Sequence, residues 1–202
     1  MKKIIAILMA AVLVLAFAGC GKTENNKAVE NNSEKEVPAR SHVLMTVAGL
    51  GEVTIELIPE YAPATVENFL SLVKDGFYDG LTFHRVISGF MVQGGDPEGT
   101  GMGGSDKNIF GEFAANGFKQ NKLKHSRGVI SMARTNHPDS ATSQFFICHG
   151  DCFDLDGQYA GFGKVIKGIE VIDKIAEVET DEADKPLSDV VIESIKVIEL
   201  GE

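Results

Sequence analysis

Short apolar segments separated by glycine-rich turns make up most of the chain after residue 40. In residues 53–58, Thr54 and Glu56 alternate with apolar residues, which is typical of a strand with one solvated face. A hairpin loop is expected at residues 48–51, between the first two such segments. The pattern predicts strands over residues 43–47, 53–58, 81–86, 90–93, 129–133, 144–148, 161–165 and 190–200.

Two segments have the spacing of helices instead. Pro63 suits the first turn of a helix. The apolar residues that follow it recur at i, i+3, i+4 and i+7, as on one buried face: Val66, Phe69, Leu70 and Val73. A second helix is predicted over residues 171–178. Residues 181–189 are acidic and contain a proline, so we predict a surface loop there. Many short strands with only two helices favour a β-barrel or a β-sandwich.

The first 20 residues have the layout of a bacterial export signal. Lys2 and Lys3 precede an uncharged apolar run, residues 4–18, which is shorter than the about 20 residues of a spanning helix. Small residues then lead directly to Cys20, an arrangement that resembles a bacterial lipoprotein signal in which this cysteine is lipidated. Phe17 stands where that motif usually has Leu. We expect a signal peptide at residues 1–19, with a plain secretory signal or an uncleaved anchor as the alternatives.

Between the expected signal peptide and the first predicted strand lie residues 20–40, which are Cys20 followed by a polar segment. It has few large apolar residues and no period, so we predict a flexible tether. The whole chain carries a formal charge of −10, and loss of Lys2 and Lys3 leaves 17 basic and 29 acidic residues, or −12. An acidic protein is not attracted to anionic lipid, which favours a covalent anchor. We therefore expect an extracytoplasmic, membrane-anchored protein with its domain over residues 41–202.

Composition and spacing exclude several classes of protein and site. An acidic chain disfavours nucleic-acid binding, and a hydrophobic content of 44% excludes disorder throughout. Three cysteines are too few for a disulfide scaffold. We expect Cys148 and Cys152 to be unpaired thiols, with Cys148 buried, and a disulfide is the alternative. Residues 99–104 match a dinucleotide-binding pattern but precede no amphipathic helix, and the scattered histidines lack metal-ligand spacing.

Three stretches carry stronger signals: residues 83–96, 143–148 and 155–165. Together they closely resemble the cyclophilin family of peptidyl-prolyl cis–trans isomerases (EC 5.2.1.8), and the similarity runs from about His42 to Glu199. Members of that family fold as a closed eight-stranded antiparallel barrel capped by two helices, which agrees with the independent strand and helix count. The resemblance implies an enzyme for X–Pro bonds, and rotation about such a bond requires no metal or cofactor.

The resemblance also implies roles for individual residues. Arg85 corresponds to the central catalytic residue, and Gln93 to a residue that bonds the substrate backbone and helps to position Arg85. Phe145 and Ile147 alternate with a pocket residue and are expected in the core. The implied substrate-binding residues form the proline pocket, the peptide-pairing strand edge and the groove: Phe90, Met91, Gly101, Ala133, Arg134, Thr135, Gln144, Phe146, Leu155 and Tyr159. The expected partners are proline-containing exported polypeptides, bound by a monomer.

A few positions beside the groove depart from the family pattern. Arg134 and Thr135 replace part of a common Ala-Asn-Ala segment, and Asp154 stands where many members have Trp or His. Tyr159 stands where many eukaryotic members have His. The alternative function is therefore a chaperone or scaffold lipoprotein that binds peptides without turnover. A small-solute-binding lipoprotein is a weaker third possibility, because the chain is too short and too strand-rich for two α/β lobes.

Overall fold

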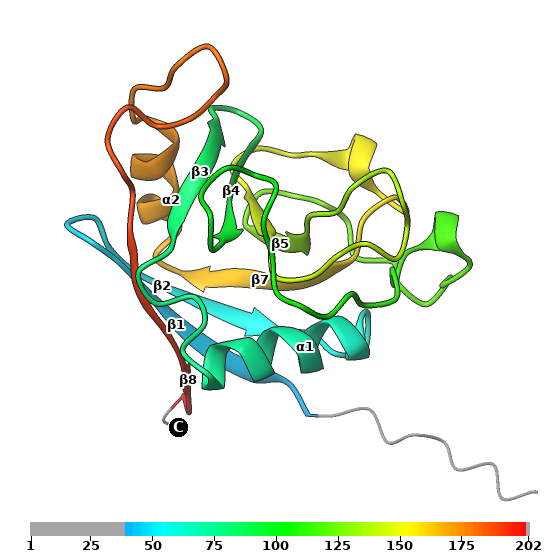
Figure 1. Ribbon diagram of the computed structural model, residues 1–202. Coiled ribbons are helices and arrows are strands. Elements are labelled where there is room, and N and C mark those ends of the chain that lie inside the picture. Colours follow the sequence, from blue (N-terminus) through cyan, green and yellow to red (C-terminus); the bar gives the residue numbers. More distant parts are fainter. Residues whose placement is uncertain (1–38, 201–202) are drawn as a thin grey trace, which may run out of the picture. The chain divides into compact units, whose positions relative to one another are not determined.

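The computed structural model describes residues 39–200, which form a mainly β domain with two α-helices (Figure 1). The predicted signal peptide, Cys20 and all but the end of the predicted tether lie outside the described residues. The elements in chain order are β1 (Ser41–Val47), β2 (Gly51–Leu57), α1 (Pro63–Lys74), β3 (Thr82–Ile87), β4 (Met91–Asp96), the 3₁₀ turn η1 (Ala114–Asn116), β5 (Val129–Met132), β6 (Phe145–Cys148), the 3₁₀ turn η2 (Phe153–Leu155), β7 (Gly161–Lys167), α2 (Ile169–Ala176) and β8 (Ile192–Ile198).

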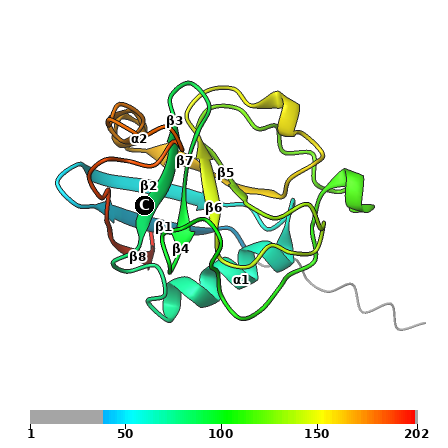
Figure 2. The same ribbon diagram turned by 45° about the horizontal axis from the view of Figure 1, so that its top comes forward.

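All eight strands belong to one antiparallel sheet with the order β3-β4-β6-β5-β7-β2-β1-β8. Each of the eight predicted strand segments overlaps one observed strand. The sheet curls around its own inner face, and the helices lie at its margins (Figures 1 and 2). The prediction of a mainly β, antiparallel architecture with two helices is therefore confirmed.

The predicted closure of the barrel is wrong, because β3 and β8 remain the two ends of the sheet. Within the described domain, the bridge that joins these ends pairs Thr82 of β3 with Val191, which precedes β8. Farther along β3, an irregular loop takes the place of a partner strand: Val86 N–H donates to the carbonyl oxygen of Asp184 at 2.8 Å. A loop cannot continue a regular ladder, so the strands form an open, curled half-barrel.

The main core is formed by buried residues of the sheet together with buried residues of both helices. α1 lies against β7 and β8, whereas α2 lies against β2, β3 and β4. The buried residues of α1 include three that the sequence predicts for its inner face: Val66, Phe69 and Val73. Phe69 centres an aromatic cluster, with its ring centroid 5.1 Å from those of Tyr78 and Phe162. None of the helices in residues 39–200 is long and apolar enough to cross a membrane.

A second, smaller buried cluster lies on the opposite face of β6. Phe145 and Ile147 belong to the main core, as predicted, and Phe146 between them belongs to the smaller cluster. The remaining buried members of the smaller cluster are Met91, Val129, Cys148 and Cys152. Because successive side chains of a strand point to opposite faces, β6 divides the two clusters.

Candidate active site

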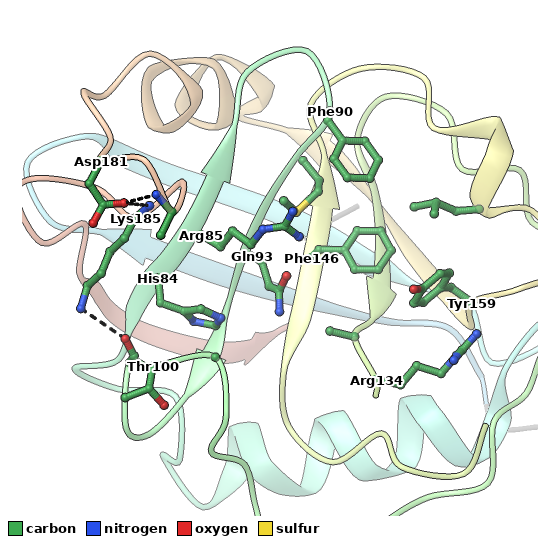
Figure 3. Close-up of a pocket in the computed structure, with 16 residues that line it drawn as sticks. His84, Arg85, Phe90, Gln93, Thr100, Arg134, Phe146, Tyr159, Asp181 and Lys185 are labelled. Carbon is green, nitrogen blue, oxygen red and sulfur yellow. Dashed lines mark hydrogen bonds between the residues drawn. The ribbon is translucent and has the colours of Figure 1, made fainter. Parts of the chain in front are cut away.

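A cavity of about 560 Å³ opens over the smaller cluster (Figure 3). Ten of the twelve predicted catalytic and substrate-binding residues line it: Arg85, Phe90, Met91, Gln93, Gly101, Ala133, Arg134, Phe146, Leu155 and Tyr159. The other two, Thr135 and Gln144, line an adjoining cavity of about 300 Å³. Because Gln93, Gly101, Ala133 and Arg134 line both cavities, the structure brings all twelve into one continuous region.

The register of three strands places the central residues in one row. Arg85 of β3 is paired with Gln93 of β4, and Gln93 is paired with Phe146 of β6. Directly paired residues of antiparallel strands share a face of the sheet, with their Cβ atoms about 4.5–5.5 Å apart. A cation, an amide and an aromatic ring therefore stand side by side along the cavity (Figure 3).

The apolar half of the cavity is rigidly supported from behind. Phe146 and Met91 are 4% and 2% exposed, so their side chains form a packed floor. The ring of Phe146 makes an edge-on contact with Tyr159, with centroids 5.8 Å apart, and stacks on His125 at 6.1 Å. His125 is held by Asp156 at 3.1 Å and by Ser131 at 3.0 Å. Such a floor suits a small apolar ring such as that of proline.

A chain of amide hydrogen bonds forms the polar half. Gln93 Nε2 donates to Gln144 Oε1 at 2.8 Å. Gln144 Nε2 in turn donates to the carbonyl oxygens of Gly103 at 2.7 Å and Gly101 at 3.1 Å. The amide of Gln93 is thereby fixed to the glycine-rich loop that borders the cavity.

Asp96 holds the same loop from the end of β4. Its carboxylate accepts hydrogen bonds from the backbone N–H groups of Glu98, Thr100 and Gly101 at 2.9, 3.0 and 2.6 Å. Burial alone would raise the pKa of Asp96, but these N–H donors outweigh burial and hold the pKa below its usual value. The loop with the dinucleotide-like glycine pattern, residues 99–104, thus directs backbone N–H groups at the carboxylate of Asp96.

Arg85 meets the cavity from a half-exposed position on β3. Its side chain is 43% exposed, and its Nε atom lies 3.4 Å from Oδ2 of Asp184. Asp181, Ala183 and Lys185 of the same acidic loop line the cavity. The sequence predicts this segment only as a surface loop, because nothing in the spacing of its residues links it to Arg85.

Arg134 is engaged with the protein itself. Its guanidinium lies 4.6 Å from the ring centroid of Tyr159 and 4.9 Å from that of Phe113. It also donates to the carbonyl oxygen of Gln158 from Nη2 at 2.9 Å. The side chain that departs from the family pattern therefore fills one wall of the cavity as a stacked cation.

His84 also lines the cavity, although the sequence points only to a structural or exposed histidine. It is the extra residue of a β-bulge, because Phe83 pairs with Gly94 and Arg85 with Gln93. A bulge interrupts the alternation of faces, so His84 and Arg85 both reach the cavity, which periodicity cannot predict. The ring of His84 is 6% exposed, and neither of its nitrogens has a hydrogen-bond partner. Burial lowers its pKa, which keeps the ring neutral.

The two cysteines beneath the cavity are free and Cys148 is buried, as predicted, and Cys152 is buried as well. Cys152 Sγ–H donates to the carbonyl oxygen of Phe90 at 3.1 Å and so supports a residue of the cavity rim. Burial raises the pKa of the Cys148 thiol. Among residues 39–200, no three His, Cys, Asp or Glu side chains are grouped to hold a metal ion.

The chain matches the family model described as "Cyclophilin type peptidyl-prolyl cis-trans isomerase/CLD" over residues 42–197. The "Peptidyl-prolyl cis-trans isomerase-like 3" of Gallus gallus is 47% identical over 150 residues, which span 73% of this chain and 91% of the relative. The "Peptidyl-prolyl cis-trans isomerase A" of Dickeya dadantii is 45% identical over 167 residues, which span 78% of this chain and 85% of the relative.

A solved structure agrees with these sequence relatives. A Cryptosporidium parvum cyclophilin-type peptidyl-prolyl cis-trans isomerase, crystallised in the presence of the dipeptide Ala-Pro, matches with a TM-score of 0.72 at 33% identity. The match covers 79% of this chain and 99% of that one. The family model, the relatives and the shared fold together show that the chain belongs to the cyclophilin-type peptidyl-prolyl cis-trans isomerases, enzyme class EC 5.2.1.8.

Proposed function

We propose that the chain accelerates rotation about X–Pro bonds in exported polypeptides, with Arg85 stabilising the twisted amide above an apolar pocket. The observation that carries this proposal is the row of Arg85, Gln93 and Phe146 across β3, β4 and β6. Rotation breaks no bond but faces a barrier of about 18–20 kcal/mol from amide resonance. The two isomers differ by only about 0.5–1 kcal/mol, so the enzyme has only to favour the twisted form over both planar forms.

Each half of the cavity would supply one part of this task. The proline ring would occupy the apolar half, against Phe146 and Met91. As the amide twists, its nitrogen regains a lone pair, and a fixed donor near that nitrogen or its carbonyl stabilises the twisted form. Arg85 is permanently charged and carries five N–H donors. Gln93, fixed by Gln144, would hold the flanking backbone beside it.

The substrate class follows from the cavity and from a relative. The Cryptosporidium parvum relative crystallised with Ala-Pro supports proline-containing peptides as ligands. Residues next to the proline would run along Ala133–Thr135 toward the adjoining cavity, which is lined largely by small and polar residues. Slow X–Pro isomerisation can limit folding, which gives such an enzyme a role in newly exported proteins.

The catalytic test compares two arginine variants. A fragment of residues 39–202 suffices, because a solved relative consists almost wholly of this domain and is folded. Cis–trans exchange of an Ala-Pro peptide would be followed by NMR. Arg85→Ala should lose roughly 10²–10³-fold of the acceleration, the cost of removing one fixed transition-state donor. Arg40→Ala removes the same charge from an exposed ion pair with Glu56 and Glu60 and should retain full activity.

The same experiment distinguishes the alternative function. A folded wild type that shifts the peptide resonances without accelerating exchange would be a binding module, and the isomerase mechanism would be abandoned. Equal activity of the wild type and Arg85→Ala would remove Arg85 from the mechanism while keeping the enzyme class.

The export signal and the cysteine after it support a lipid anchor on Cys20, so we place the enzyme outside the cytoplasm, tethered to the membrane. The full chain would be expressed in a bacterial host with a labelled fatty acid. The wild type should carry the label and sediment with membranes, whereas Cys20→Ser should do neither. Unlabelled, soluble wild type would contradict the anchor and leave the catalytic proposal intact.

A further inference from the structure

The acidic loop of residues 180–186 is a closed turn fastened to β3. Asp181 Oδ1 accepts two backbone N–H bonds from within the turn, at 2.8 and 2.9 Å. The turn is tied to the strand by Val86 N–H, which donates to the carbonyl oxygen of Asp184 at 2.8 Å. The place of Asp184 beside β3 is therefore set by backbone contacts, independently of its own carboxylate.

Asp184 has an unusual backbone conformation. Its φ of 64° lies in the left-handed region, and among residues 39–200 it is the single residue other than glycine with a positive φ. Side chains generally avoid this region, although Asp and Asn tolerate it better than others. Glycine would adopt it without strain. Strained residues persist where the surroundings enforce them and often serve a function, which directs attention to the carboxylate.

The carboxylate of Asp184 reaches the cavity only through Arg85. Its Oδ2 atom lies 3.4 Å from Nε of Arg85, and Asp184 itself does not line the cavity. Figure 3 shows Arg85 extending from β3 across Gln93 toward Phe146. The contact is an ion pair at the Nε edge of the planar guanidinium, so it favours orientations that keep this edge toward residues 180–186. Such an orientation would leave the two terminal amino groups for the cavity, which Arg85 lines.

We propose that Asp184 is a positioning residue, whose carboxylate holds Arg85 at Nε so that the terminal amino groups meet the rotating prolyl amide. The inference rests on the proposed role of Arg85 and adds a second residue, 99 positions away in the chain, to the same site. Asp184 acts through Arg85 and makes no contact with the peptide.

Two variants remove the carboxylate of Asp184 and still tolerate its left-handed backbone conformation. Asp184→Gly and Asp184→Asn both suit a left-handed φ. Asn retains an acceptor without charge, whereas Gly retains neither. Glu182→Gln is the matched control, because it removes the same charge from an exposed residue of the same turn. The fragment of residues 39–202 and an Ala-Pro peptide serve as before, with kcat and KM measured separately.

The pair is exposed to solvent, so the expected effect is moderate. Asp184→Gly should lower kcat roughly two- to fivefold and change KM little. The kcat of Asp184→Asn should lie between those of Asp184→Gly and the wild type, and Glu182→Gln should match the wild type. The Nε–H resonance of Arg85 should shift in Asp184→Gly but not in the control. In an Arg85→Ala background, Asp184→Gly should have no further effect on kcat.

The outcomes separate this inference from the proposed function. If Arg85→Ala shows the expected loss of activity while Asp184→Gly keeps the wild-type kcat, the positioning role is wrong and the role of Arg85 stands. If Asp184→Gly lowers kcat equally in the Arg85→Ala background, the carboxylate acts on the fold and the inference is likewise wrong. If Arg85→Ala is as active as the wild type, the proposed role of Arg85 fails first.

Discussion

The two sides of the cavity are built in different ways. On the strand side, Arg85, Gln93 and Phe146 occupy paired positions of β3, β4 and β6, so the register of the sheet sets their spacing. On the loop side, residues 99–104 and 180–186 have no such ladder, and the hydrogen bond from Lys185 Nζ to the carbonyl oxygen of Gly99, at 3.4 Å, joins them. The strand side depends on packing and pairing, whereas the loop side depends on individual polar contacts.

The largest expected effect is on the strand side, at Phe146. Phe146→Ala removes a ring that is 4% exposed and is packed against Tyr159 and His125. The free energy of unfolding should fall by about 3–5 kcal/mol, and KM for an Ala-Pro peptide should rise. Urea denaturation and NMR exchange measure the two effects.

A neighbouring phenylalanine provides the control for this prediction. Phe153 of η2 is 52% exposed, so Phe153→Ala should change the free energy of unfolding by less than about 0.5 kcal/mol. If both variants lowered the free energy of unfolding equally, the floor of the cavity would be no better packed than the exposed surface of the protein. The contrast between the two sides of the cavity would then fail.

A smaller effect is expected at Asp96, on the loop side. Asp96→Asn places an amide where the carboxylate accepts N–H bonds from Thr100 and Gly101. One or more of these donors loses its partner, which should cost about 1–3 kcal/mol of unfolding free energy near neutral pH. Asp106→Asn, at an exposed position two residues beyond that loop, should cost nothing measurable.

The same pair of variants gives a pH dependence with a defined sign. The N–H donors lower the pKa of Asp96 in the folded state, after outweighing its burial. The carboxylate therefore stabilises the fold fully above the unfolded pKa of about 3.9, and this stability is lost as the pH falls through the folded pKa. The difference between wild type and Asp96→Asn should shrink below about pH 4, and a difference that is constant down to pH 2.5 would contradict the assignment.

This contrast also explains what the sequence can predict. The strands are encoded locally by the apolar segments, whereas the site residues are predicted from the family resemblance of residues 83–96 and 143–148 and not from periodicity, which the bulge at His84 interrupts. The closed barrel was wrong because closure depends on how β3 meets the chain near Val191, more than 100 residues later. The contact of Asp184 with Arg85 has the same long range and leaves no periodic signal. What the sequence predicts for residues 1–38 stays a prediction.

The pH dependence of stability tests whether His84, at the bulge in β3, is buried as the structure shows. Burial lowers its pKa, so the unfolded chain binds the proton more readily than the folded protein does. His84 should therefore make the wild type lose stability as the pH falls from about 6.5 toward 5, and this one ring contributes at most about 1.4 kcal/mol per pH unit. His84→Gln should make this dependence less steep and leave the part due to His125, whose pKa burial also lowers, whereas His137→Gln, at an exposed position, should leave it unchanged. Parallel curves for the wild type and His84→Gln would show that the ring is solvated.

The smallest effect is expected at the contact that joins the two loops. Lys185 is exposed, and its Nζ donates to the carbonyl oxygen of Gly99 at 3.4 Å, which is a long hydrogen bond. Lys185→Met keeps much of the side-chain length and removes the donor and the charge. The free energy of unfolding should change by less than about 0.5 kcal/mol, as for other exposed substitutions.

Thermal or urea denaturation of Lys185→Met would contradict this prediction if the free energy of unfolding fell by more than about 1 kcal/mol. The loop side would then not depend on individual polar contacts alone. The loops would then stabilise each other cooperatively, as the paired strands do, and the bond between Lys185 and Gly99 would be one of several. A small loss would instead leave each loop held by a separate carboxylate, residues 99–104 by Asp96 at the end of β4 and residues 180–186 by Asp181. The loop side could then vary in sequence without disturbing the row on the strands.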